Sequence, residues 1–294
     1  MPDDKEKIIL KKAWKEAAQK LRKIEIETPL LDARLLLQHV LNIKYEQLIT
    51  SGNRELTEQE IESFNKLVAR RLLREPIAKI LEKKEFWGLG FKTTKDTLDP
   101  RPDSETLIEC VIQTFKDSNR DLNILDLGTG SGCLLITLLF LYNNSKGLGV
   151  DKSIEALKIA GENAESNNVS ERANFIVSNW LDNVEGTFDV IICNPPYIKR
   201  EATNYLSPEV RLYDPIPALD GGADGLDCYR EIISQLGKFL AIHGRCFFEI
   251  GKWQEHEVSD LISENGFEII EVRNDLAGIP RVIVFTKPYL KVVK

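Results

Sequence analysis

The chain has 294 residues, of which 43% are hydrophobic and 29% charged. This balance is typical of a globular protein with a real core, and it excludes a disordered chain, a collagen-like repeat or a disulfide-bonded miniprotein. The net charge of −7 is uneven, since residues 1–80 carry +3 and the rest −10. The length and the uneven charge favour two units, and the acidic one is poorly suited to bind a phosphate backbone.

The cysteines and histidines are scattered, with no CxxC pair and no metal-ligand spacing, so we expect no metal. An odd number of cysteines suits a reducing compartment. Residues 1–5 are charged where a signal peptide would turn apolar, and the most apolar run, 133–142, is about half the length that spans a bilayer. These features predict a cytoplasmic protein without a membrane segment.

Residues 1–82 are expected to form a bundle of helices, which we interpret as a packing or docking module. Apolar residues recur at helical spacing over 6–23, and a second helix is predicted from Pro29, with Thr28 as its N-cap. A third helix is predicted after Thr57, where Thr57 and Glu60 have the spacing of a capping box. Nothing in this unit has a catalytic pattern.

Residues 83–100 are interpreted as a hairpin that links the two units. The aromatic, glycine-containing stretch 86–91, together with Ile80 and Leu81, has turn signals nearby. The catalytic unit is predicted to span 101–294.

In the second unit, short apolar strands alternate with helices, which predicts an α/β fold with a mostly parallel sheet and helices on both faces. Ligands of such sheets lie beyond the carboxyl ends of the strands, so the residues that follow each strand are the candidates for chemistry. The predicted strands are 122–127, 147–150, 175–177, 190–193, 246–250, 267–273 and 281–286, and the predicted helices are 133–142, 154–164, 227–240 and 253–264.

A glycine-rich turn follows the first strand of this unit. Gly128, Thr129, Gly130, Ser131 and Gly132 form a GxGxG pattern, in which the missing Cβ atoms allow a tight turn and a close approach of the backbone to a ligand. A dinucleotide fingerprint would need glycine at the position of Cys133, and no P-loop lysine follows.

Polar residues follow the next two strands. Asp151 can accept hydrogen bonds from both hydroxyls of a ribose, and the competing interpretation is a helix cap. After the third strand, Asn179 can bond an adenine edge and Trp180 can pack on the ring, although a polar turn and a core tryptophan explain these residues equally well. An adenosine-containing cofactor is therefore indicated.

The stretch Asn194-Pro195-Pro196-Tyr197 follows the fourth strand. The side-chain oxygen of Asn194 and the carbonyl of Pro195 are two fixed acceptors that can hold both hydrogens of a planar –NH2 group. Tyr197 can stack on a planar substrate. Such a site suits methylation of a weakly nucleophilic amine or amide, where positioning supplies most of the rate.

With these motifs in place, the sequence resembles the peptide chain release factor N(5)-glutamine methyltransferases of the HemK/PrmC type, over about residues 10–286. The glycine turn and residues 194–197 carry the resemblance, and six further segments narrow it. These segments are 74–78, 85–88, 101–105, 218–226, 248–251 and 275–278.

The resemblance implies a Rossmann-like class I S-adenosylmethionine-dependent methyltransferase with a seven-stranded sheet, which methylates the Gly-Gly-Gln glutamine of class I release factors. It implies cofactor contacts by residues 128–132, Asp151, Trp180 and Asn194, and it places the glutamine against Asn194, Pro195, Pro196 and Tyr197. We expect Asn179 to bind the cofactor although the family usually has aspartate there. Residues 278–281 also depart from the family pattern, because the family commonly has a charged residue near Pro280.

Two other functions fit parts of the pattern. Residues 194–197 also suit an exocyclic-amine methyltransferase acting on DNA or RNA, and a non-catalytic adaptor with a vestigial cofactor fold is a third hypothesis. The acidic second unit and the complete set of motifs favour an enzyme acting on a protein, and a monomer is expected. Arg101, Asp103 and Glu105 are candidates for the substrate entrance, and a solvated turn with an ion pair explains them equally well. Glu249 follows a strand and can lie near the site, but a surface or structural carboxylate is the favoured interpretation.

Overall fold

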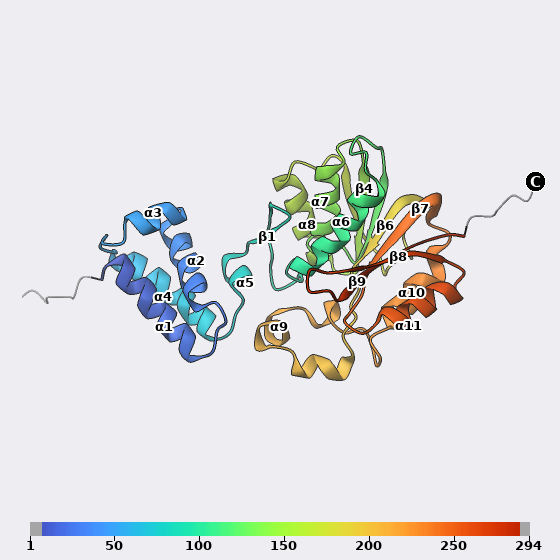
Figure 1. The fold of residues 1–294 in the computed structure, drawn as a ribbon. Coiled ribbons are helices and arrows are strands. Elements are labelled where there is room, and N and C mark those ends of the chain that lie inside the picture. Colours follow the sequence, from blue (N-terminus) through green and yellow to red (C-terminus); the bar gives the residue numbers. More distant parts are fainter. Residues whose placement is uncertain (1–7, 289–294) are drawn as a thin grey trace, which may run out of the picture. The chain divides into compact units, whose positions relative to one another are not determined.

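The computed structural model describes residues 8–288, and the chain divides into two compact units, residues 1–82 and 83–294 (Figure 1). The charged residues 1–5, and the first two residues of the helix predicted over 6–23, lie outside the described part.

The first unit is helical, as predicted. Two short helices, α3 and α5, were not predicted, because six and five residues are too few to show a helical period. The helices are α1 (Leu10–Lys23), α2 (Pro29–Leu41), α3 (Tyr45–Thr50), α4 (Glu58–Leu72) and α5 (Ile77–Leu81).

The helix starts of this unit test the capping predictions. The capping box of α4 is confirmed, since Thr57 accepts from the Glu60 N–H and the Glu60 carboxylate accepts from the Thr57 N–H. Helix α2 begins at Pro29 with Thr28 at the N-cap position, as predicted, but the Thr28 side chain makes no capping hydrogen bond. The Thr28 hydroxyl donates to Asp32 (2.8 Å), which is itself paired with buried Arg71 (2.7 Å). The buried pair takes the hydroxyl away from the helix N–H groups.

The hairpin consists of β1 (Lys84–Phe86) and β2 (Leu89–Phe91). It belongs to the second unit, because Phe86 and Phe91 are buried in the core of that unit. Ile80 and Leu81, which the sequence placed with the hairpin, lie in α5 instead. Glu105 accepts a hydrogen bond from the backbone N–H of Trp87 (3.0 Å), so this carboxylate holds the hairpin.

The second unit is built on a seven-stranded sheet with the order β5-β4-β3-β6-β7-β9-β8. The five strands from β5 to β7 are parallel, and β9 runs antiparallel to both β7 and β8. The strands are β3 (Asn123–Leu127), β4 (Lys146–Asp151), β5 (Ala173–Val177), β6 (Phe188–Cys193), β7 (Leu240–Glu249), β8 (Glu268–Asn274) and β9 (Pro280–Thr286).

Helices cover both faces of this sheet, as predicted (Figure 1). The core of one face is formed with α6, α7 and α8, and that of the other face with α10 and α11. The helices of this unit are η1 (Pro102–Ser104), α6 (Glu105–Thr114), α7 (Cys133–Leu141), α8 (Ile154–Ser166), η2 (Arg200–Tyr205), α9 (Pro208–Tyr213), η3 (Ile216–Ala218), α10 (Asp227–Leu236) and α11 (Glu255–Glu264).

The central strands β4, β3, β6 and β7 end at one edge of the sheet, and the predicted site residues follow three of them. Within residues 8–288, every helix is too short or too polar to cross a bilayer.

Candidate active site

The glycine turn after β3 is held by the neighbouring strand β4. The carbonyl of Val150 accepts hydrogen bonds from the N–H groups of Gly128 and Thr129 (both 2.9 Å), and the Asp151 carboxylate accepts one from Gly130 (3.0 Å). Gly130 has a φ of +54°, and a Cβ atom there would meet no side chain. The turn therefore presents bare backbone to a ligand.

Three residues of the turn that were predicted to contact the cofactor, Thr129, Ser131 and Gly132, do not line the cavity in front of the turn. The Thr129 hydroxyl donates to buried Asp126 (2.6 Å), and buried Ser131 accepts from Asn163 through its carbonyl. A Cβ on Gly132 would come within 2.8 Å of the Ile136 side chain. These residues shape the turn and start α7.

A cavity of about 550 Å³ opens in front of the turn, a volume within the range of about 300–1,000 Å³ usual for small-molecule sites. The Asp151 carboxylate lines it and accepts from Gly130 and from the Ser153 N–H (2.9 Å). A carboxylate has about four acceptor positions, so two remain for a ribose diol. The predicted residues that line this cavity are Gly128, Gly130, Asp151, Asn179, Trp180, Asn194 and Pro196.

The departure at Asn179 has a local explanation. Its Nδ2 donates to the Glu231 carboxylate of α10 (2.7 Å), and both residues line the cavity. Aspartate at 179 would face this carboxylate at hydrogen-bond distance, where two like charges repel. The Trp180 ring packs over the glycine turn, since a Cβ on Gly128 would lie 3.2 Å from it.

A second cavity of about 250 Å³ shares Asn194 with the first. Pro195 and Tyr197 line this smaller cavity, whereas Pro196, predicted to bind the same substrate, lines the larger one. The two prolines thus face different cavities, and Asn194 lies at their junction.

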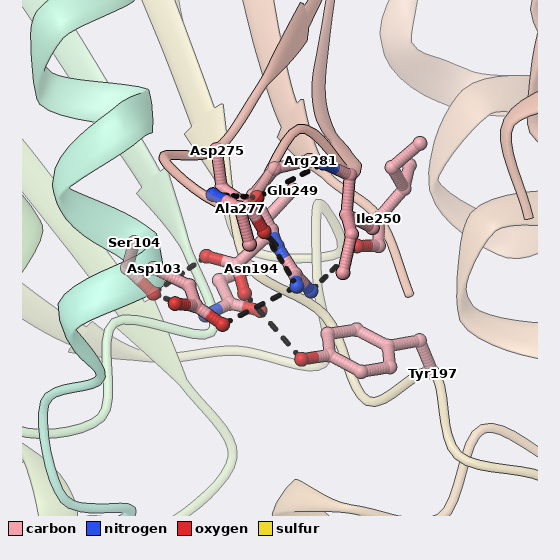
Figure 2. Close-up of polar contacts among 10 residues, drawn as sticks. Asp103, Ser104, Asn194, Tyr197, Glu249, Ile250, Asp275, Ala277 and Arg281 are labelled. Carbon is pink, nitrogen blue, oxygen red and sulfur yellow. Dashed lines mark hydrogen bonds and ion pairs between the residues drawn. The ribbon is translucent and has the colours of Figure 1, made fainter. Parts of the chain in front are cut away.

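Glu249 is not a surface carboxylate, and it lies near the site, the alternative that the sequence left open. This carboxylate ends β7, is 1% exposed and lines the smaller cavity. The Glu249 carboxylate accepts a hydrogen bond from the Ser104 hydroxyl (2.5 Å), and the Tyr197 hydroxyl lies 3.5 Å from the same carboxylate (Figure 2). The Ser104 hydroxyl in turn accepts a hydrogen bond from Asn194 Nδ2 (3.1 Å). Burial raises the pKa of Glu249 to about 7.

The rim of the smaller cavity is tied together by ion pairs. Arg101 donates to Asp214 (2.7 Å), and Arg281 pairs with Asp103 (3.2 Å) and Asp275 (3.0 Å) (Figure 2). Arg101 and Asp103 line the cavity, so these two candidates for the substrate entrance are close to it, whereas the third candidate, Glu105, holds the hairpin. Pro280, in the second segment that departs from the family pattern, lies immediately before Arg281 at the start of β9.

Glu249→Gln is expected to make the protein more stable relative to wild type as the pH rises. The raised pKa means that folding favours the protonated carboxyl. The contribution of Glu249 to the stability of the wild-type protein is therefore complete below about pH 4.5 and is lost as the pH rises through about 7. Glutamine does not ionise, so the gain in unfolding free energy should be about 2 kcal/mol larger at pH 8 than at pH 5. Urea unfolding at both pH values measures it, and an equal difference at the two would contradict the burial argument.

Comparison with solved structures agrees with this fold. A methyltransferase from Pyrococcus furiosus matches with a TM-score of 0.52 and 20% identity, over 75% of this chain and 98% of that one. A T. thermophilus 16S rRNA N2 G1207 methyltransferase matches with a TM-score of 0.51 and 18% identity, over 70% of this chain and 50% of that one. At these identities the likeness concerns the fold alone, a class I methyltransferase fold.

Sequence comparison is more specific. Residues 12–81 match the family model of the PrmC N-terminal domain, and residues 96–209 match the methyltransferase small domain. The release factor glutamine methyltransferase of Agrobacterium fabrum is 37% identical over 92% of this chain and 95% of its own length. The release factor glutamine methyltransferase of Rhodospirillum rubrum is 39% identical over 94% of this chain and 85% of its own length. The chain therefore belongs to the family of release factor glutamine methyltransferases.

Proposed function

We propose that this protein transfers a methyl group from S-adenosylmethionine to the side-chain amide nitrogen of the glutamine in the Gly-Gly-Gln motif of class I peptide chain release factors. The observation that carries the proposal is the position of Asn194 at the junction of two cavities. The larger cavity has the features of a nucleoside site, and the smaller cavity is large enough to hold a single side chain.

The larger cavity suits the cofactor through three features of the chain. The turn offers bare backbone at Gly128 and Gly130, the Asp151 carboxylate has acceptor positions left for ribose hydroxyls, and Trp180 provides an aromatic wall. Asn179 and Glu231 add an acceptor edge for the exocyclic amine of adenine. S-adenosylmethionine supplies an electrophilic methyl group on a positively charged sulfur.

The smaller cavity suits the glutamine side chain. Asn194 Oδ1 and the Pro195 carbonyl accept the two amide hydrogens, which aims the nitrogen toward the larger cavity. Tyr197 provides an aromatic surface for the planar amide. Aligning two reactants in this way is worth about 7–11 kcal/mol of the barrier. The methylated nitrogen sheds its extra proton readily to water, so the reaction needs no dedicated base.

The helical unit is proposed to dock the release factor, and the enzyme to act as a monomer in the cytoplasm on protein and not directly on nucleic acid. Large apolar side chains stand exposed on the helical unit, and a partner that covered them would gain from their burial. Those most relevant are Leu30 (50% exposed), Tyr45 (43%), Ile49 (53%) and Leu73 (70%).

Substituting Leu30 and Leu73 together by glutamate is expected to raise KM for the release factor about tenfold while kcat stays within about twofold, because buried apolar anchors dominate interface energy. The matched control is Ile242→Glu with Ile270→Glu, two exposed apolar residues of the second unit. Steady-state kinetics measures both, and an equal effect of the two double variants would argue against docking by the helical unit.

Incubation of the protein with methyl-labelled cofactor and a purified class I release factor tests the proposed function. Label in the release factor supports it, and no label after many turnover times contradicts it. The alternative, methylation of an exocyclic amine of DNA or RNA, is not favoured, because the curated relatives at 37–39% identity are named for release factor glutamine.

A further inference from the structure

Two side chains outside the predicted motif lie directly behind Asn194. Ser104 ends η1, just before α6, and is 2% exposed, and Glu249 ends β7. Strands β6 and β7 are neighbours, with Cys193 opposite Phe248, so Asn194 and Glu249 both follow this pair. Three elements far apart in sequence therefore meet at one point behind the catalytic candidate (Figure 2).

With the Glu249 carboxyl ionised, the hydrogen bonds among these three side chains run in one direction only. The Asn194 Nδ2 group has hydrogens but no acceptor position, so it donates to Ser104 Oγ (3.1 Å). The Ser104 hydroxyl has a single hydrogen, which it donates to Glu249 Oε2 (2.5 Å). With Nδ2 turned to Ser104, the other end of the Asn194 carboxamide, Oδ1, is the end left for the cavities.

The orientation of this carboxamide decides which chemical group the site accepts. With Oδ1 toward the substrate, Asn194 accepts a hydrogen from an –NH2 group. In the reversed orientation it would present its own –NH2 to the –NH2 of the substrate, and two donors cannot bond. The two orientations are nearly equal in shape, so hydrogen bonds alone distinguish them.

The surroundings of Glu249 indicate a role in the site. Its carboxylate oxygens contact Ser104, which bonds Asn194, at 2.5 Å, and the hydroxyl of Tyr197, which lines the smaller cavity, at 3.5 Å. The nearby guanidinium of Arg281 is instead paired with Asp103 and Asp275. Glu249 thus links the supports of Asn194 and Tyr197, the two side chains expected to hold the substrate amide.

We propose that Ser104 and Glu249 are positioning residues, which hold the Asn194 carboxamide with Oδ1 toward the substrate and so make the site select an amide nitrogen. The inference rests on the proposed function and adds to it the residues that orient its central group.

Ser104→Ala, compared with Ser104→Thr, tests the proposal on the full chain with a class I release factor and S-adenosylmethionine. Alanine removes the acceptor for Asn194 Nδ2, and kcat is expected to fall about 10- to 100-fold, the effect of one lost buried hydrogen bond. KM should stay within about threefold, because docking of the release factor does not involve this residue. Threonine keeps the hydroxyl and is expected to retain kcat within about threefold.

Two further variants separate positioning from a general structural role. Glu249→Gln keeps an accepting oxygen for Ser104 and should retain most of kcat, whereas Glu249→Leu should match Ser104→Ala. In an Asn194→Ala background, Ser104→Ala should cause no additional loss, because residues that act as a unit are not additive. Binding of S-adenosylmethionine by calorimetry and a thermal melt confirm that each variant is folded.

The outcomes are distinct. If the wild-type protein is active and Ser104→Ala has the same kcat, the inference is overturned and the proposed function stands. An equal loss from Ser104→Ala with and without Asn194 would also overturn the inference. An inactive but folded wild-type protein would overturn the proposed function and this inference together.

Discussion

Asn194→Ala is expected to lower kcat by about two to three orders of magnitude, the usual effect of removing one preorganised hydrogen-bonding group from a reacting centre. Alanine removes the acceptor that holds one hydrogen of the substrate amide, while the Pro195 carbonyl remains to hold the other. The amide can then turn away from the larger cavity, and the alignment that supplies most of the rate is lost.

The same substitution should change binding far less than it changes turnover. Affinity for S-adenosylmethionine should fall less than about tenfold, since Asn194 offers the cofactor at most one neutral hydrogen bond. Asn265→Ala is a matched control, because Asn265 is exposed after α11 and bonds only its own helix. A kcat of Asn194→Ala close to that of the control would contradict a role of Asn194 in the reaction.

Asp151→Ala is expected to weaken S-adenosylmethionine binding by about 100- to 10,000-fold. A hydrogen bond to a charged group contributes about 1.5–3 kcal/mol, and a ribose diol can make two of them with this carboxylate. The substitution also releases the Gly130 N–H, so the glycine turn loses one of its anchors to β4. Isothermal titration calorimetry of the cofactor measures the effect directly.

The control for this prediction is Asp117→Ala, which removes an exposed carboxylate from the loop after α6. A dissociation constant of Asp151→Ala within threefold of the control would mean that the carboxylate acts only on the backbone of its own loop. In that case the cofactor would have to be held by other groups of the cavity.

The sequence predicts the strand-end chemistry well because parallel strands bring their carboxyl ends to one edge. Gly128, Asp151 and Asn194 follow β3, β4 and β6, so strand order alone was enough to place them together. The same reasoning placed Pro196 with Pro195. The two prolines face different cavities, a separation that depends on local backbone direction and not on strand order.

Contacts between distant segments could not be predicted in this way. Ser104 and Glu249 are 145 positions apart, and Asn179 and Glu231 are 52 positions apart. Neither pair has a local pattern, and only the packing of η1 and α10 onto the strand ends brings them together. The single available signal for Glu249 was a carboxylate at the end of an apolar strand, which an exposed loop residue produces equally well.

Local rules failed where a tertiary contact competed with them. Thr28 precedes Pro29 as a helix cap should, yet its hydroxyl bonds Asp32, which neutralises buried Arg71. The strand predicted from 246 begins at Leu240, because His243, Gly244 and Arg245 break the apolar run while the backbone remains in the sheet.

Methylation of one nitrogen atom of one glutamine is tested most directly by mass spectrometry of the release factor. After reaction with S-adenosylmethionine, the peptide that contains Gly-Gly-Gln should carry one added methyl group, and fragmentation should place it on the glutamine side chain. The same peptide from a reaction with Asn194→Ala should be largely unmodified. An unmodified glutamine after prolonged reaction with the folded, cofactor-binding wild-type protein would contradict the account.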